Sequence, residues 1–152
     1  MAYQEDEEPM DVPAVLEALN AVLSMLYRSA LQYTVASGSL FGLQYLALGA
    51  ELRTYGEAEL ADTRFVVEKL AALGGTPTTD VKPFGWTGEP EDAVRMVVAC
   101  EKEAIDALRA VIPHTGTEGR SEALEHLMEH LILRKQNQID FLNRAVREAT
   151  SD

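Results

Sequence analysis

Apolar residues recur at alternating steps of three and four along four long segments of the chain. This period places them on one face of an α-helix, whereas a half-buried strand would be apolar at every second residue. The pattern therefore predicts four helices and no strand. We expect them over residues 11–37, 43–74, 90–112 and 118–149.

Local signals agree with these boundaries. Asp11 followed by Pro13 is typical of a helix start, and Pro90 with the two acidic residues behind it marks a second start, at the positive end of the helix dipole. The second segment ends at 74–77, Gly-Gly-Thr-Pro, where glycine can adopt the left-handed conformation and proline cannot continue a helix.

The lengths of the connections select the topology. The first and second helices are joined by a few residues, as are the third and fourth, so each pair is expected to be an antiparallel hairpin. Between the pairs lie about 16 residues. At ~3.3 Å per residue they can span ~50 Å, the length of a long helix. We predict an all-α four-helix bundle with one long crossover between the second and third helices.

Five polar residues interrupt the apolar faces near the middle of the helices, where leucine or valine would be expected. An unpaired charge buried there would cost several kcal/mol, so the five side chains are expected to meet in one cluster. Two tyrosines on the same helix faces can donate hydrogen bonds to that cluster. The polar residues are Glu59, Asp62, Glu101, Lys135 and Gln138, and the tyrosines are Tyr33 and Tyr55.

From about Leu19 to Ala145 the chain resembles the ferritin-like superfamily, and within it most closely the bacterioferritins. The resemblance rests on Leu19-Asn20 and Gln32-Tyr33 in the first helix, on the segment 71–80 (AALGGTPTTD), and on Ile-Asp-Phe-Leu at 139–142. It implies a ferritin-like bundle, a role in iron storage or homeostasis, and side-by-side pairing of subunits along the first two helices, as a homodimer or a larger homo-oligomer.

The resemblance also implies that the di-iron ferroxidase centre is mostly lost. The glutamate of the first helix falls on Leu26, and the Glu-x-x-His pair of the second helix becomes Glu59 and Asp62. Glu101 matches the glutamate of the third helix. The Glu-x-x-His pair of the fourth helix becomes Lys135 and Gln138.

Two further positions depart from the bacterioferritin pattern. The residue after Glu59, which is a haem-ligating methionine in bacterioferritins, is Leu60, so no haem is expected. We also expect no fifth helix after the bundle, where bacterioferritins carry a short one, and this expectation argues against the conventional 24-subunit shell.

Two interpretations of the polar cluster remain open. In the first, no metal binds: Lys135 neutralises part of the charge of Glu59, Asp62 and Glu101, and crowding raises the pKa of at least one carboxyl group until it holds a proton. In the second, the three carboxylates keep one Fe²⁺ or Mn²⁺ ion, for which oxygen ligands are suitable. The first interpretation predicts a non-catalytic bundle with little or no ferroxidase activity, and the second predicts a metal-dependent oxidase. A third possible function, a partner of an active ferritin subunit, does not depend on the state of the cluster.

Charge and cysteine content limit the partners and the cellular compartment that we expect for the protein. With 13 basic and 25 acidic residues the net charge is −12, which argues against nucleic acid or an anionic membrane as partner. A single cysteine, Cys100, excludes an intramolecular disulfide. Residues 1–10 are interpreted as an acidic disordered tail without the features of a secretory signal, and no uninterrupted apolar run has the length of a membrane span. We expect a cytoplasmic protein.

His126 and His130 form a second candidate metal-binding feature. Their spacing of four puts both imidazoles on one helical face. The predicted apolar face of this helix nevertheless does not include them, so they are expected to lie away from the core. We interpret them as surface residues, with an adventitious or inter-subunit zinc site as the alternative.

Overall fold

The computed structural model describes residues 7–150, with side chains through residue 147, and consists of four long helices. They are α1 (Val12–Ser39), α2 (Leu46–Ala72), α3 (Pro90–Val111) and α4 (Gly119–Thr150). Two short 3₁₀ turns, η1 (Leu43–Tyr45) and η2 (Ile112–His114), lie in the α1–α2 and α3–α4 connections. No strand is present in this part of the chain. The predicted all-α bundle is confirmed.

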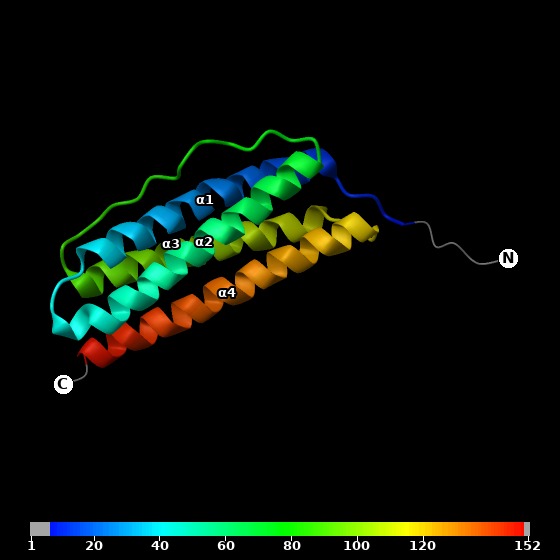
Figure 1. Cartoon of the computed structure of the whole chain (residues 1–152). Coiled ribbons are helices and arrows are strands. Elements are labelled where there is room, and N and C mark those ends of the chain that lie inside the picture. The colour runs from blue at the N-terminus through cyan, green and yellow to red at the C-terminus, as the bar shows by residue number, and fades with distance from the viewer. Residues whose placement is uncertain (1–6, 151–152) are drawn as a thin grey trace.

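The topology is the predicted one with a single long crossover. The chain between α2 and α3 runs back along the outside of α1, so that α2 and α3 point in the same direction (Figure 1). Hydrogen bonds hold this segment to one face of α1. The amide of Thr78 donates to Asn20 Oδ1 at 2.9 Å, and the hydroxyl of Tyr27 donates to the Thr78 carbonyl at 2.9 Å. The amide of Lys82 donates to the Ser24 carbonyl at 3.2 Å.

The helix ends follow the expected chemistry. The carboxylate of Asp11 accepts from the amide of Ala14 at 3.3 Å and caps α1. After α2, Gly74 adopts a positive φ of 82°, and the amide of Gly75 donates to the carbonyl of Leu70 at 2.9 Å. This is the left-handed helix ending that a glycine permits at little cost.

The N-terminal boundary differs from the prediction. Residues 1–6 of the expected disordered tail lie outside the described residues, but Met10 is only 6% exposed and packs into the core. Its amide donates to Glu118 Oε1 at 2.9 Å, and Glu8 exchanges backbone and side-chain hydrogen bonds with Thr117. The last residues of the predicted tail are therefore part of the fold, because the α3–α4 connection provides their partners.

The core consists of two apolar clusters with a polar layer between them. Along each of the four helices, the residues of the first cluster and those of the second are separated by buried polar side chains. Helix α1 shows the order: Leu19, Leu23 and Leu26 belong to the first cluster, Ser29 follows, and Tyr33 belongs to the second. The midpoints of all four helices thus meet at one level of the bundle.

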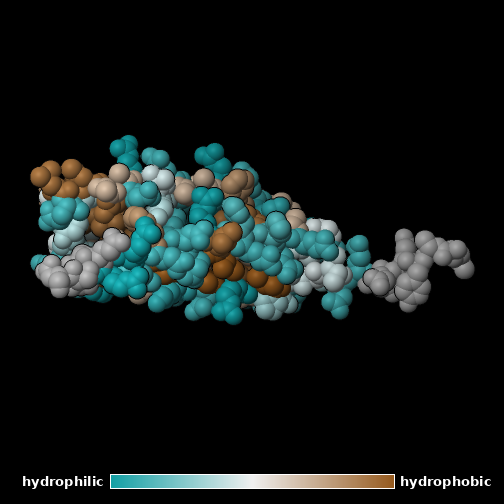
Figure 2. All heavy atoms as spheres, turned by 90° about the horizontal axis from the view of Figure 1, so that it is seen from below, coloured by the Kyte–Doolittle hydropathy of each residue, from teal (hydrophilic) through white to brown (hydrophobic). Residues whose placement is uncertain are grey.

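Among the described helices, α1 is long and apolar enough to cross a membrane by length and composition, with a mean hydropathy of 1.2 over an 18-residue window. Its apolar side chains are those of the bundle core, and 44% of that window is buried. Packing therefore accounts for the apolar character of α1. The face of the molecule on the α4 side is mostly hydrophilic, with apolar patches at one end and near the middle (Figure 2).

Candidate functional site

The polar layer is organised around the ammonium group of Lys135, which α4 places at the centre of the bundle. The residue is 1% exposed. Its Nζ lies 2.9 Å from Glu59 Oε1 on α2, and 3.0 and 3.1 Å from the two carboxylate oxygens of Glu101 on α3. Glu59 and Glu101 are fully buried. Three of the four helices thus contribute an ionisable side chain to one buried cluster.

Helix α1 contributes two hydroxyl groups. Ser29 Oγ donates to Glu101 Oε1 at 2.5 Å and accepts from Lys135 Nζ at 3.3 Å. The hydroxyl of Tyr33 donates to the other oxygen, Glu101 Oε2, at 3.2 Å. Glu101 therefore accepts hydrogen bonds from a lysine, a serine and a tyrosine, so both of its buried oxygens have donors inside the bundle.

Gln138, one helical turn after Lys135, completes the cluster. With its amide nitrogen facing the carboxylates, it donates to Glu59 Oε1 and to Glu101 Oε2, both at 3.1 Å. The reverse orientation would set the amide oxygen against two acceptor oxygens. The hydrogen-bonding requirement of the network thus fixes the orientation of the side chain.

One carboxyl group of the cluster, Glu59, holds a proton at neutral pH. Burial raises the pKa of Glu59 to about 8, even though Lys135 acts in the opposite direction. For Lys135, burial alone would lower the pKa, but the adjacent Glu101 and Glu59 outweigh it and hold the pKa above its ordinary value. At neutral pH Glu59 therefore holds a proton and adds no negative charge beside the ammonium group of Lys135.

The position of that proton follows from the contacts of Glu59. Its Oε1 receives hydrogen bonds from Lys135 and Gln138, whereas Oε2 is buried and has no hydrogen-bond partner in the described part of the chain. Donors crowd around Oε1, so the proton is best placed on Oε2.

A group of aromatic rings adjoins the network. The ring of Tyr55 meets Tyr33 edge to face at a centroid distance of 5.7 Å, and meets Phe141 in the same way at 5.8 Å. Burial, reinforced by Glu101 and Glu59, raises the pKa of Tyr33 well above its ordinary value. The pKa of Tyr55 is also raised, first by burial and then by Glu51. Both tyrosines are therefore neutral at physiological pH. Tyr33 donates a hydrogen bond to Glu101, whereas Tyr55, predicted to donate as well, meets the network through its ring contact with Tyr33.

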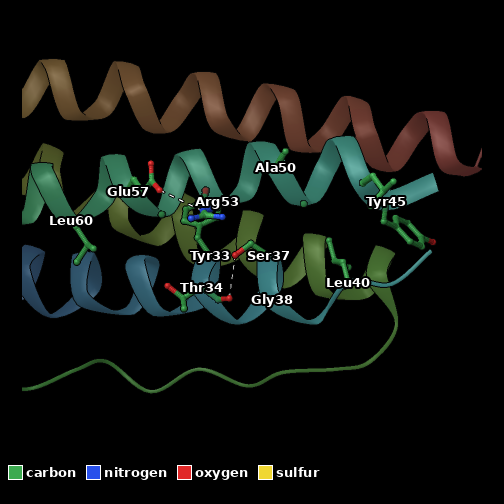
Figure 3. Close-up of a pocket in the computed structure, with 13 residues that line it drawn as sticks. Tyr33, Thr34, Ser37, Gly38, Leu40, Tyr45, Ala50, Arg53, Glu57 and Leu60 are labelled. Atoms are coloured by element: carbon green, nitrogen blue, oxygen red, sulfur yellow. Dashed lines mark hydrogen bonds and ion pairs between the residues drawn. The ribbon is translucent and has the colours of Figure 1, made fainter. Parts of the chain in front are cut away.

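Tyr33 also lines a groove between α1 and α2 (Figure 3). Gly56, on the α2 side, makes the close approach of these helices possible: a Cβ atom there would lie 3.2 Å from the Cβ of Tyr33. Tyr33 is fully buried, so it separates the network from this groove. Leu60, 63% exposed, lines the same groove.

Asp62 forms a separate ion pair at the edge of the network. Its Oδ2 lies 3.1 Å from Nε of Arg134, whose side chain is 36% exposed. Burial raises the pKa of Asp62, and Arg134 opposes that effect. The structure thus gathers Glu59, Glu101, Lys135 and Gln138 around one point but turns Asp62 toward a different cation.

The remaining predicted positions lie as follows. Leu26 is fully buried in the first apolar cluster. His126 and His130 are exposed on α4, and Nε2 of His130 lies 3.4 Å from the guanidinium of Arg134. Within residues 7–150, no group of three or more His, Cys, Asp or Glu side chains is arranged to hold a metal ion.

Sequence reasoning missed two residues of this region, Ser29 and Arg134. Ser29 follows Leu26 by three and precedes Tyr33 by four, so the helical period could have placed it on the inner face. Arg134 had no comparable signal, because its role depends on the direction in which Asp62 points.

Comparisons with known proteins agree with this architecture. Residues 16–150 match the family model of the ferritin-like domain. No curated protein matches the chain in sequence. Among solved structures, a ferritin-like, diiron-carboxylate protein from Bacillus anthracis superposes with a TM-score of 0.83 at 21% identity, covering 90% of this chain and 97% of the other.

Two further structures are similar. A bacterioferritin-related protein from Bacteroides fragilis, a dodecameric thioferritin, gives a TM-score of 0.82 at 17% identity, covering 92% of this chain and 88% of that one. The bacterioferritin of Rhodobacter capsulatus gives a TM-score of 0.81 at 20% identity, covering 92% of this chain and 87% of that one. At these identities the likeness concerns the fold. Together with the family model, which spans most of the sequence, it identifies the chain as a member of the ferritin-like family.

Proposed function

We propose that this chain is a bacterioferritin-like protein of iron storage or homeostasis in which the buried Lys135 network occupies the place of a di-iron ferroxidase centre. The observation that carries the proposal is the position of Lys135 Nζ, 2.9 to 3.1 Å from the carboxylate oxygens of Glu59 and Glu101. Ferroxidase activity is accordingly absent or weak.

The donor set at this position does not fit a pair of iron ions. An ammonium group has three donors and no lone pair, so Lys135 cannot ligate a metal, and its charge repels one. Leu26 supplies an aliphatic side chain where the family has a carboxylate. The oxygens of Glu59 and Glu101 that a metal would use already accept hydrogen bonds from Lys135, Ser29 and Gln138.

A residual mononuclear Fe²⁺ or Mn²⁺ site on Glu59, Asp62 and Glu101 is less well supported. It would require Lys135 to leave or to lose its proton, and the two glutamates raise the pKa of Lys135. Asp62 would also have to give up its pairing with Arg134. Leu60, which offers no haem-ligating atom, favours a protein without haem.

The proposal also covers how the protein attracts iron, how its subunits pair and where in the cell it is located. A net charge of −12 attracts Fe²⁺ to the surface without a catalytic centre. Exposed apolar side chains on α1 and α2, among them Leu31, Val35 and Leu60, favour pairing of two subunits along these helices in a cytoplasmic homo-oligomer. A mixed assembly with an active ferritin subunit is the alternative, and co-purification from the native source would reveal it.

The decisive experiment restores the missing ligands. A variant with Leu26→Glu, Asp62→His, Lys135→Glu and Gln138→His carries the full set of carboxylates and histidines. We expect it to oxidise Fe²⁺ in air far faster than the unmodified protein, whose rate should match a protein-free control. The matched control variant carries Glu101→Gln in addition and should lose the gained activity. Rapid oxidation by the unmodified protein that Glu101→Gln abolishes would overturn the proposal.

A further inference from the structure

The first half of α4 carries two histidines that the polar network does not use. His126 and His130 are four residues apart and exposed, whereas the core residues of this part of the helix, Leu124, Met128 and Leu131, are buried on another face. Side chains at positions i and i+4 of a helix are neighbours, with ~5–6 Å between Cβ atoms. The two imidazoles are thus within reach of a common ligand.

The helix face around the two histidines is open. A shallow surface hollow follows one face of α4 and includes both imidazoles, a carboxylate one turn before them and small residues that leave space for their rings. Its lining residues are Gly119, Glu122, Ala123, His126, Leu127 and His130.

The charges near this hollow favour a cation. Glu122, four residues before His126, is the carboxylate that lines the hollow. A cation contacts one member of the pair: the guanidinium of Arg134 lies 3.4 Å from His130 Nε2. That guanidinium is also paired with Asp62, with its Nε 3.1 Å from Asp62 Oδ2, so its charge is partly neutralised and it has another partner when it releases the imidazole.

We propose that His126 and His130 form a surface chelate for one divalent transition-metal ion of the zinc class. Neutral imidazole is a preferred ligand of Zn²⁺, and two histidines four apart on one helix are a recurrent zinc-binding pair. This site provides two protein ligands, and water fills the other coordination positions. It is distinct from the Lys135 network and does not depend on the function proposed above.

The test is calorimetric titration of the apo-protein with Zn²⁺ alone, in a buffer that contains excess Mg²⁺ to occupy carboxylate sites, since Mg²⁺ prefers oxygen ligands. We expect one Zn²⁺ per chain, bound at least tenfold more weakly by His126→Ala and by His130→Ala. His114→Ala is the matched control, because His114 is an exposed histidine in the α3–α4 connection, and its affinity should be unchanged.

Circular dichroism of each variant verifies that its helices are intact. These substitutions lie on an exposed face, so they should leave the fold unaltered. Three results would overturn the proposal: no Zn²⁺ binding by the unmodified protein, binding of equal strength in both histidine variants, or a stoichiometry of one ion per two chains.

Discussion

Two neighbouring cations of α4, Lys135 and Arg134, lie in different surroundings. Lys135 is enclosed, with both of its carboxylate partners fully buried, whereas Arg134, the preceding residue, keeps 36% of its side chain exposed beside Asp62. A shift of one residue along α4 therefore separates a charge at the bundle centre from a charge at its edge.

The difference in burial sets the energetic role of each pair. In the interior, removing one partner leaves the other charge without compensation, which costs about 3–5 kcal/mol. At the edge, the carboxylate of Asp62 is only 4% exposed, but the guanidinium of Arg134 is 36% exposed and water can solvate it when Asp62 is neutralised. Loss of the Asp62 charge should therefore cost about 1 kcal/mol or less. We therefore expect the central network to be essential for the fold in its present form and the Asp62–Arg134 pair to be dispensable.

The largest effect is expected from Lys135→Met. The carboxylate of Glu101 then loses its counter-charge inside the bundle, and the free energy of unfolding at pH 7 should fall by about 3–5 kcal/mol in urea denaturation. Lys102→Met, on the exposed side of α3, is the matched control and should change stability by less than about 0.5 kcal/mol. Adding Glu101→Gln to Lys135→Met should recover part of the loss. A cost below about 1 kcal/mol would show that Lys135 does not hold the network together.

The second prediction concerns the pH dependence produced by Glu59. Its pKa is about 8 in the folded state against an ordinary 4.5, so between these values the folded protein holds one more proton than the unfolded chain at this site. The contribution of Glu59 to the free energy of unfolding therefore decreases as the pH rises, by about 1.4 kcal/mol per pH unit. Glu59→Gln cannot release this proton. Its stability relative to the unmodified protein should increase steadily from pH 5 to pH 8.

Glu57→Gln serves as the control for that titration, because Glu57 is an exposed residue of the same helix. Its stability relative to the unmodified protein should vary little over this range. An identical pH profile for Glu59→Gln and the unmodified protein would mean that Glu59 is ionised in the folded state.

A smaller effect is expected from Tyr33→Phe, which removes one of the donors to Glu101. Hydrogen bonds to charged groups contribute about 1.5–3 kcal/mol, and Lys135 and Ser29 remain as donors, so we expect a loss of about 1.5 kcal/mol in thermal or urea unfolding. Tyr55→Phe keeps the ring contacts with Tyr33 and Phe141 and should have less effect. Equal losses in the two variants would indicate that ring packing, and not the hydroxyl of Tyr33, stabilises this region.

The smallest effect is expected from Asp62→Asn, which breaks the pair at the edge. The guanidinium of Arg134 keeps access to water, so the loss of stability in urea denaturation should be about 1 kcal/mol or less. A loss as large as that of Lys135→Met would remove the distinction between the two pairs.

The sequence allowed the fold to be predicted because its signals are local and repeated. The three- and four-residue period, the ending at Gly74 and the length of the crossover each depend on nearby residues. The position of Met10 was missed because its burial depends on the α3–α4 connection, more than 100 residues away in the chain. An acidic segment gives no local sign of such a contact.

Within the site, the helical period identified which polar residues face inward but not which partner each one chooses. Four of these residues meet as the predicted helix faces indicated: Glu59, Glu101, Lys135 and Gln138. Asp62 was grouped with them, yet its side chain pairs with Arg134, since the exact direction of a side chain depends on the packing of α2 against α4. The pKa of Glu59 likewise depends on complete burial, which composition does not reveal.

The most direct test of the central claim is the amount of iron held per chain. It is measured by elemental mass spectrometry after anaerobic loading with Fe²⁺ and desalting, in a His126→Ala/His130→Ala variant so that the surface histidines contribute nothing. The Lys135 network predicts a value near zero. One iron per chain would indicate a mononuclear site on the buried carboxylates, and two would contradict the account by showing a working di-iron centre.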